Sequence, residues 1–162
     1  MLIHDSICKH INTGILSRHN LSTAKILAYT QDEALQKIQE MKMPSAPKAV
    51  VVNVGTNDVR DKADPDVIVQ KYSSIVDKLK KKFPKTKVVY SNIIPREDSE
   101  ELQDTVEYVN AVANRRLKWD LTIRNAELCG GKLKAKDGIH LTTPGVSRLA
   151  CNIRDSVLAA FE

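Results

Sequence analysis

The stretch AVVVNVG, residues 49–55, is dominated by valine and ends in a glycine. Valine-rich runs without polar alternation are typical of strands buried on both faces, as in a parallel sheet. Helical patterns flank this stretch on both sides. Residues 30–41 begin with Thr30 and Glu33 at the spacing of a capping box. Residues 64–83 follow the run, with Asp64 as the expected N-cap and Pro65 in the first turn.

The same alternation of strand and helix continues over the rest of the chain. Further strands are expected at residues 2–4, 24–29, 87–95 and 120–125, and further helices at residues 6–16, 99–118 and 143–161. This order predicts the α/β class: a five-stranded parallel sheet between two layers of helices, a three-layer αβα sandwich. In such sheets the functional crevice lies beyond the carboxyl ends of the strands.

Length and composition fit one globular domain over residues 1–162. The first expected strand starts almost at residue 1, so we expect a domain excised from a longer protein. No apolar run approaches the roughly 20 residues that span a bilayer, and no signal-peptide pattern is visible. Three cysteines, Cys8, Cys129 and Cys151, match no zinc-site or CxxC spacing. They are therefore expected to be free thiols of an intracellular, cytoplasmic protein.

The net charge is +5, and part of the excess is concentrated in KLKKKFPKTK, residues 78–87. One interpretation is a solvated helix C-terminus, where cations offset the helix dipole. The other is a patch that contacts RNA or an anionic membrane surface. The lysines concerned are Lys78, Lys80, Lys81, Lys82, Lys85 and Lys87.

Three groups of polar residues follow expected strands or precede the last helix. Ser6 follows the first strand, Gly55 and Asn57 follow the third, and Asp137 and His140 precede the last helix. Taken singly, each residue could have a purely structural role, as a helix cap, a turn residue or a surface histidine. Together they supply what nucleophilic catalysis needs: Ser6 as nucleophile, His140 as base and Asp137 as its orienter.

The same sheet edge also offers oxyanion donors. These are the N–H groups of Ser6 and Gly55 and the side-chain amide of Asn57. The neighbouring carboxylates, Asp5 and Asp58, are expected to accept backbone N–H bonds and to be structural.

The segments HDS (4–6), GTND (55–58) and DGIH (137–140) together resemble the motif blocks of the SGNH, or GDSL-type, serine hydrolases. The resemblance covers nearly the whole chain. It implies a flavodoxin-like αβα sandwich that hydrolyses carboxylic esters, such as acetyl, short-acyl or lipid esters, with no metal or cofactor. More narrowly, the chain is similar to esterase domains in first-open-reading-frame proteins of animal non-LTR retrotransposons. That similarity would imply a link to lipid or membrane surfaces.

Two positions depart from the family pattern. His4 stands where the family has its first-block glycine, and Ala28 takes the place of the second-block glycine, whose N–H would serve the oxyanion hole. His4 is expected to narrow the pocket or to lie under it, and Arg96 is either an exposed loop residue or lines the pocket. The alternative hypothesis is a catalytically weak hydrolase fold that binds RNA or anionic membranes.

Overall fold

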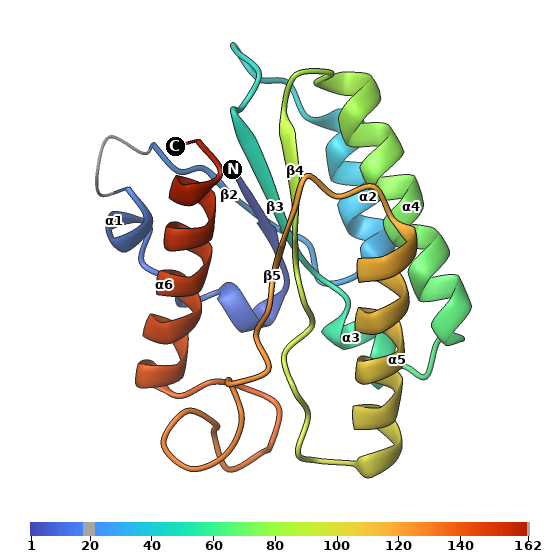
Figure 1. The fold of residues 1–162 in the computed structure, drawn as a ribbon, viewed down its shortest axis with the longest axis vertical. Helices are drawn as coiled ribbons and strands as arrows, with labels where there is room; N and C mark the ends of the chain where they lie inside the picture. Colours follow the sequence, from blue (N-terminus) through green and yellow to red (C-terminus); the bar gives the residue numbers. More distant parts are fainter. Residues whose placement is uncertain (18–21, 162) are drawn as a thin grey trace.

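Five parallel strands form the sheet, in the order β2-β1-β3-β4-β5 (Figure 1). The computed structural model describes residues 1–17 and 22–161. The order is the flavodoxin-like one, with a topological switch point between β1 and β3. The predicted α/β fold class is therefore confirmed. The strands are β1 (Leu2–His4), β2 (Lys25–Leu27), β3 (Ala49–Asn53), β4 (Lys87–Ser91) and β5 (Leu121–Ile123).

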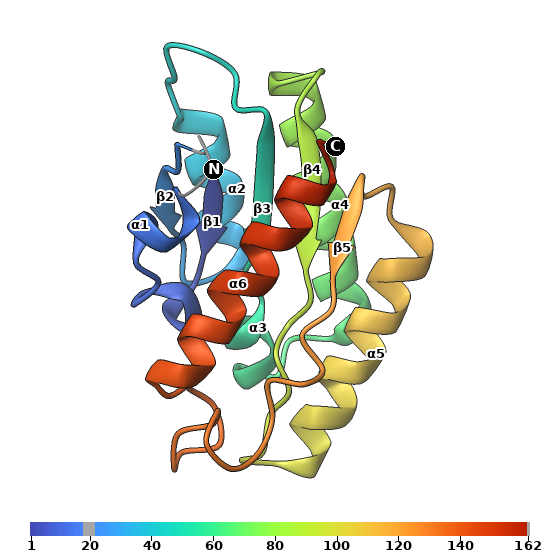
Figure 2. The ribbon, with the colours of Figure 1, turned by 60° about the vertical axis from the view of Figure 1, so that its left-hand side comes forward.

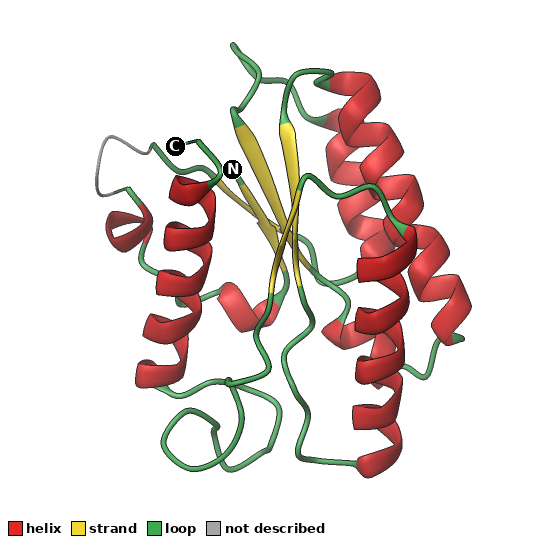
Figure 3. Ribbon diagram, in the orientation of Figure 1, coloured by secondary structure: helices red, strands yellow, loops and turns green. Residues whose placement is uncertain are grey.

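Helices cover both faces of the sheet and give the three layers (Figures 2 and 3). One face carries α2, α4 and α5, with the short α3 at the lower end in Figure 1, and the other carries α1 and α6. The helices are α1 (Thr13–Leu16), α2 (Gln31–Glu40), α3 (Thr56–Arg60), α4 (Pro65–Lys82), α5 (Glu100–Arg116) and α6 (Thr143–Ala159).

The central strand β3 explains why both faces need a helical layer. Val50 and Val52 belong to the apolar core on the α2–α4–α5 side, while Val51 belongs to the core on the α6 side. All three are almost completely buried. Burying one valine side chain stabilises the fold by roughly 1.5–3 kcal/mol. Because its valines alternate between the two faces, β3 contributes such burial to both cores.

The expected helix over residues 6–16 is wrong as a single element. Residues Ser6–Cys8 form one turn of 3₁₀-helix, η1, and the α-helix begins only at Thr13. The Lys25 ammonium accounts for the break, because it donates to the carbonyls of Cys8, Lys9 and Ile11 at 3.0 Å each. The Asn12 side chain then caps the new helix by accepting from the Gly14 N–H at 2.7 Å.

Strand β4 is shorter than the pattern predicted, ending at Ser91 and not at Pro95. The Asn110 side chain of α5 accepts from the Ile93 N–H at 3.0 Å and donates to the Ile93 carbonyl at 2.9 Å. A side-chain amide thus replaces the neighbouring strand at this position. The chain is thereby free to turn away from the sheet into the β4–α5 loop.

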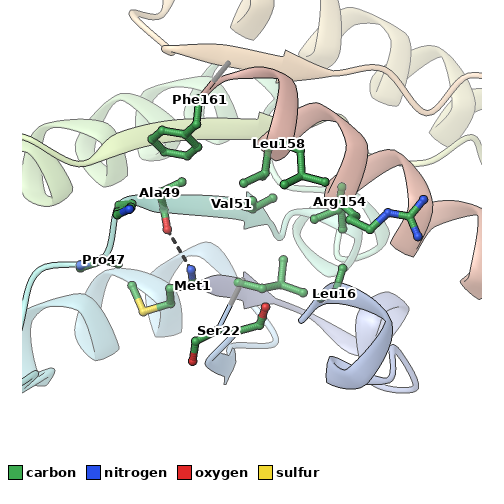
Figure 4. A pocket seen from close by; sticks show the side chains of 14 residues that line it. Met1, Leu16, Ser22, Pro47, Ala49, Val51, Arg154, Leu158 and Phe161 are labelled. Carbon is green, nitrogen blue, oxygen red and sulfur yellow. Dashed lines mark hydrogen bonds between the residues drawn. The ribbon is translucent and has the colours of Figure 1, made fainter. Parts of the chain in front are cut away.

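A cavity of about 510 Å³ opens at the amino ends of β1 and β3, under the last turns of α6 (Figure 4). Leu2, Val51, Val157 and Phe161 contribute to its apolar wall. It lies at the sheet edge opposite the carboxyl ends, and no predicted site residue lines it. Within the described ranges, no helix is both long and apolar enough to cross a membrane.

Candidate active site

The nucleophile turn begins where β1 ends. Asp5 is the N-cap of η1: its carboxylate accepts from the Ile7 N–H at 2.9 Å and from the Thr56 N–H at 3.3 Å. Asp5 is buried, and this burial raises the pKa of its carboxyl to about 6, against the opposing effect of the two N–H donors. Ser6 follows directly and is only partly buried. Asp5 therefore joins the nucleophile turn to the loop after β3, which is a structural role.

The loop after β3 depends on Gly55, whose φ of +123° is rarely adopted by other residues. A Cβ atom at this position would also collide with the Tyr72 hydroxyl, which is hydrogen-bonded to the Val54 carbonyl. Gly55 is the N-cap of α3, a short helix that is not among the elements predicted from the sequence. Among the described residues, neither the N–H of Gly55 nor that of Ser6 has a hydrogen-bond partner.

Asn57 lies in the first turn of α3, with only 9% of its surface exposed. Its side-chain amide donates to the Tyr29 carbonyl at 2.8 Å. The Tyr29 N–H in turn donates to the Glu33 carboxylate at 2.9 Å. Of the predicted capping box, the bond from the Glu33 N–H to the Thr30 hydroxyl forms, at 3.3 Å, while the Glu33 carboxylate takes the N–H one residue before the cap. An amide has two N–H bonds, and the carbonyl of Tyr29 uses one of them. Tyr29 is thus a residue that the sequence reading missed.

Asp58 joins α3 to the start of α2. Its carboxylate accepts from the Gln31 N–H at 3.1 Å and lies 4.0 Å from the Lys71 ammonium. Burial raises the pKa of the Asp58 carboxyl, although these partners favour its charged form. Its contacts are those expected of a structural carboxylate.

The base loop, Asp137–Gly138–Ile139–His140, holds its histidine through Nδ1. One Asp137 oxygen is 2.6 Å from His140 Nδ1, and the other accepts from the N–H groups of Ile139 and His140 at 2.9 Å each. The hydrogen bond with His140 is the main reason that the pKa of Asp137 is lowered to about 2. With Nδ1 facing the carboxylate, Nε2 is left as the proton acceptor.

The nucleophile turn, the α3 loop and the base loop all lie at the carboxyl ends of the strands, at the bottom of Figure 1. The His140 and Asp137 side chains are about half exposed. Within the described residues, Ser6 makes no hydrogen bond to His140. Such contacts are often long before substrate binds and tighten in the reacting complex.

Two predicted site residues have their donors engaged elsewhere. The Ala28 N–H donates to the His4 carbonyl at 2.7 Å, which continues the β1–β2 pairing by one residue. It is therefore not available as an oxyanion donor in this structure. His4 is 3% exposed and lies under the nucleophile turn, with Nδ1 2.7 Å from the Asp5 carbonyl. Burial lowers the pKa of His4, which favours the neutral ring.

Arg96 is neither an exposed loop residue nor free to meet a substrate. It borders a cavity of about 580 Å³ beside α5, but its guanidinium is paired with Asp98 and donates to the Thr56 carbonyl. This ion pair lowers the pKa of the Asp98 carboxyl. The alternative of an exposed loop arginine is therefore wrong, and the guanidinium beside this cavity has its partners within the protein.

A chain of buried polar side chains lies beneath the nucleophile turn. The Cys8 thiol donates to Asn53 Oδ1 at 3.0 Å, and Asn53 Nδ2 donates to Ser91 Oγ at 2.8 Å. Asn125 Nδ2 donates to the same Ser91 oxygen at 2.9 Å. Burial raises the pKa of the Cys8 thiol, which is a packing and hydrogen-bonding residue. The three cysteines are free.

Most of the predicted lysine patch is engaged within the protein. Lys80 pairs with Asp120 at 2.5 Å, Lys82 donates to the last carbonyls of α2, and Lys87 lies 4.8 Å from the Phe161 ring. Lys78 donates to the Gln39 side chain. Lys81 and Lys85 are exposed. These contacts favour the helix-terminus interpretation. In the described part of the chain, no cluster of three or more His, Cys, Asp or Glu side chains is placed to hold a metal ion.

The fold and these loops define the class of protein. Residues 16–147 match the GDSL-like lipase/acylhydrolase family. The chain therefore belongs to this family. The matched range includes the loop after β3 and the base loop but not Ser6, whose assignment rests on its position at the carboxyl end of β1, in the turn that contacts the loop after β3. The comparison with curated proteins found no match.

Solved structures of this class are similar over almost the whole chain. TesA has a TM-score of 0.75 at 20% identity, with 98% of this chain and 97% of that chain covered. A carbohydrate esterase of family 3 from Talaromyces cellulolyticus has a TM-score of 0.73 at 20% identity, covering 98% and 95%. An acetyl esterase variant with an acetate ion has a TM-score of 0.73 at 19% identity, again covering 98% and 95%. At these identities the likeness supports the shared fold.

Proposed function

We propose that this protein is a serine esterase that hydrolyses carboxylic esters through Ser6, His140 and Asp137. The observation that carries the proposal is the Asp137–His140 pair, which leaves Nε2 free at the sheet edge where Ser6 begins η1. The Asp137 carboxylate accepts two backbone N–H bonds of the base loop and also pairs with His140 Nδ1, although the histidine is half exposed and needs no partner for its burial. A catalytic base needs such a partner, because the base must keep one tautomer and one orientation.

In the proposed reaction, Ser6 Oγ attacks the ester carbonyl and its proton passes to His140 Nε2. The oxyanion is held by the unpaired N–H groups of Ser6 and Gly55 and by the second N–H bond of the Asn57 amide. The tetrahedral intermediate collapses, and the alcohol leaves with the proton from His140. Water, deprotonated by His140, then attacks the acyl-serine, and the acid is released as Ser6 Oγ leaves with that proton. Ala28 has no part in this scheme, because its N–H is used by His4.

Short acyl esters, acetyl esters above all, are the proposed substrates. The structural neighbours include an acetyl esterase that holds an acetate ion and a carbohydrate esterase. The half-exposed Asp137 and His140 side chains also suit an ester whose alcohol part extends into solvent. The proposal has two more specific forms. In one the substrates are lipid esters, and in the other the chain is the esterase domain of a retrotransposon protein.

The test is hydrolysis of p-nitrophenyl esters from acetate to long chains by the wild type, Ser6→Ala and Ser74→Ala. Ser74 is the matched control, because it is exposed on α4 and its hydroxyl donates to the Gln70 carbonyl of the same helix. Turnover by the wild type and Ser74→Ala, together with loss in Ser6→Ala and loss of its labelling by a fluorophosphonate, supports the proposal. Equal turnover by all three proteins would rule out Ser6 as the nucleophile.

The alternative, a weak hydrolase that binds RNA or anionic membranes, draws on the exposed Lys81 and Lys85 and on the engaged N–H of Ala28. The internal contacts of Lys80, Lys82 and Lys87 speak against it. It predicts binding to RNA or anionic vesicles that weakens steeply with salt and persists in Ser6→Ala.

A further inference from the structure

Residues 95–98, here called the bracket loop, are part of the connection between β4 and α5 at the carboxyl ends of the strands. Its Arg96 side chain is 1% exposed. Nε and Nη2 donate to the two oxygens of the Asp98 carboxylate at 2.9 and 2.5 Å. The Gln103 side chain of α5 accepts from the Arg96 N–H at 2.7 Å. Asp98 therefore fixes the orientation of the guanidinium, while Gln103 holds the backbone of Arg96.

The third donor of this guanidinium reaches the loop that carries the oxyanion donors. Nη1 donates to the Thr56 carbonyl at 3.2 Å. Thr56 lies between Gly55 and Asn57, and its N–H donates to the Asp5 carboxylate. Thr56 is thus held on one side by the nucleophile turn and on the other by Arg96.

The next residue of the bracket loop holds the base loop. The Glu97 N–H donates to the Gly138 carbonyl at 2.8 Å, directly after Asp137. Gly138 has a φ of +68°, and a Cβ atom there would lie 2.8 Å from the Asp98 nitrogen and the Glu97 carbonyl carbon. The base loop therefore packs backbone against backbone on the bracket loop, and only glycine permits this approach.

We propose that Arg96 is a positioning residue that fixes the oxyanion donors relative to the base, through Thr56 on one side and the Glu97–Gly138 contact on the other. The inference rests on the proposed esterase function. Two consecutive residues thus contact the two halves of the site, Arg96 through its fixed guanidinium and Glu97 through its backbone N–H. An arginine is required because its planar fork can pair with a carboxylate and still donate in a second direction. Small displacements of catalytic groups are costly, and losing one oxyanion donor typically lowers the rate ~10²–10³-fold.

The test compares Arg96→Met and Arg96→Lys with Lys80→Met as the matched control. Like Arg96, Lys80 pairs with an aspartate, Asp120, and donates to a backbone carbonyl, that of Thr86. These contacts lie at the amino ends of the strands, away from the proposed site. The readouts are the melting temperature, kcat and KM for p-nitrophenyl acetate, and the rate of Ser6 labelling by a fluorophosphonate. Rates are measured well below each melting temperature. Asp98→Asn, which keeps the guanidinium and loosens its hold, is added as a milder variant.

We expect Arg96→Met to lower kcat and the labelling rate ~10²-fold, with KM changed less than about threefold. Arg96→Lys should recover much of the melting temperature without recovering kcat, and Asp98→Asn should lower kcat by a smaller factor. Lys80→Met should keep the wild-type kcat. The inference is overturned if the kcat values of the Arg96 and Asp98 variants follow the control once corrected for folded protein. A wild type without Ser6-dependent turnover would instead overturn the proposed function, and this inference with it.

Discussion

The side-chain amide of Asn57 donates to the backbone carbonyl of Tyr29 at 2.8 Å. This hydrogen bond joins the loop after β3 to the loop after β2 and fixes the plane of the amide. One N–H bond of the amide is thereby committed, and the other is left for a substrate oxyanion.

Asn57→Ala should therefore lower kcat by ~10²–10³-fold, because it removes one oxyanion donor. The measurement is kcat and KM with p-nitrophenyl acetate. Asn114→Ala is the control, since Asn114 is an exposed residue of α5. A kcat for Asn57→Ala within threefold of that control would show that the amide does not hold the oxyanion.

A glycine pair tests whether crowding at the bracket loop matters beyond backbone strain. Gly138 and Gly130 have nearly equal φ values, +68° and +63°, but a Cβ atom at Gly130 would meet nothing within 4 Å. Gly130→Ala should cost about 1–2 kcal/mol of unfolding free energy from the left-handed conformation alone. Gly138→Ala should cost clearly more and should also lower kcat, as measured by urea denaturation and ester hydrolysis. Equal losses of unfolding free energy in the two variants would mean that the base loop can move away from the bracket loop at no further cost.

Ser91→Ala tests the polar chain beneath the nucleophile turn. Ser91 is fully buried, and its oxygen accepts from Asn53 and Asn125. Removing it leaves two buried amide donors without an acceptor, so we expect a loss of about 1–3 kcal/mol in unfolding free energy. Ser74→Ala, on the exposed face of α4, should change it by less than about 0.5 kcal/mol. A stability of Ser91→Ala equal to that control would show that the network contributes little.

The raised pKa of Asp5 predicts a pH dependence of folding. The native carboxyl, with a pKa of about 6, binds its proton more tightly than the unfolded chain does, with its ordinary value of 3.8. The contribution of Asp5 to stability is therefore greatest below pH 4 and declines as the pH rises to about 6, by up to about 3 kcal/mol. Urea denaturation of the wild type and Asp5→Asn between pH 3.5 and 7.5 measures it. The wild type should lose stability relative to the variant across this window, and parallel curves would contradict the prediction.

Several features of this protein could be predicted from local sequence. The valine run of β3 alternates between two cores, and the Thr30, Asp64, Ser99 and Thr142 caps lie where helices begin. These features depend on residues within a few positions of one another, which is why pattern and propensity suffice. The alternation of strands and helices predicted a parallel sheet. In such a sheet Ser6, Asn57 and His140 all lie at the carboxyl ends of the strands.

Other features were decided only by contacts between distant parts of the chain. Lys25 interrupts the helix expected after Ser6, and Asn110 ends β4 early. The N–H of Ala28 is used by His4, and Arg96 is buried against Thr56 and is not exposed on a loop. In each case the hydrogen-bond partner of a polar group is a residue many positions away, which the local sequence pattern does not specify. Since burial makes an unpaired polar group costly, tertiary packing determines which partner it takes, and local sequence cannot.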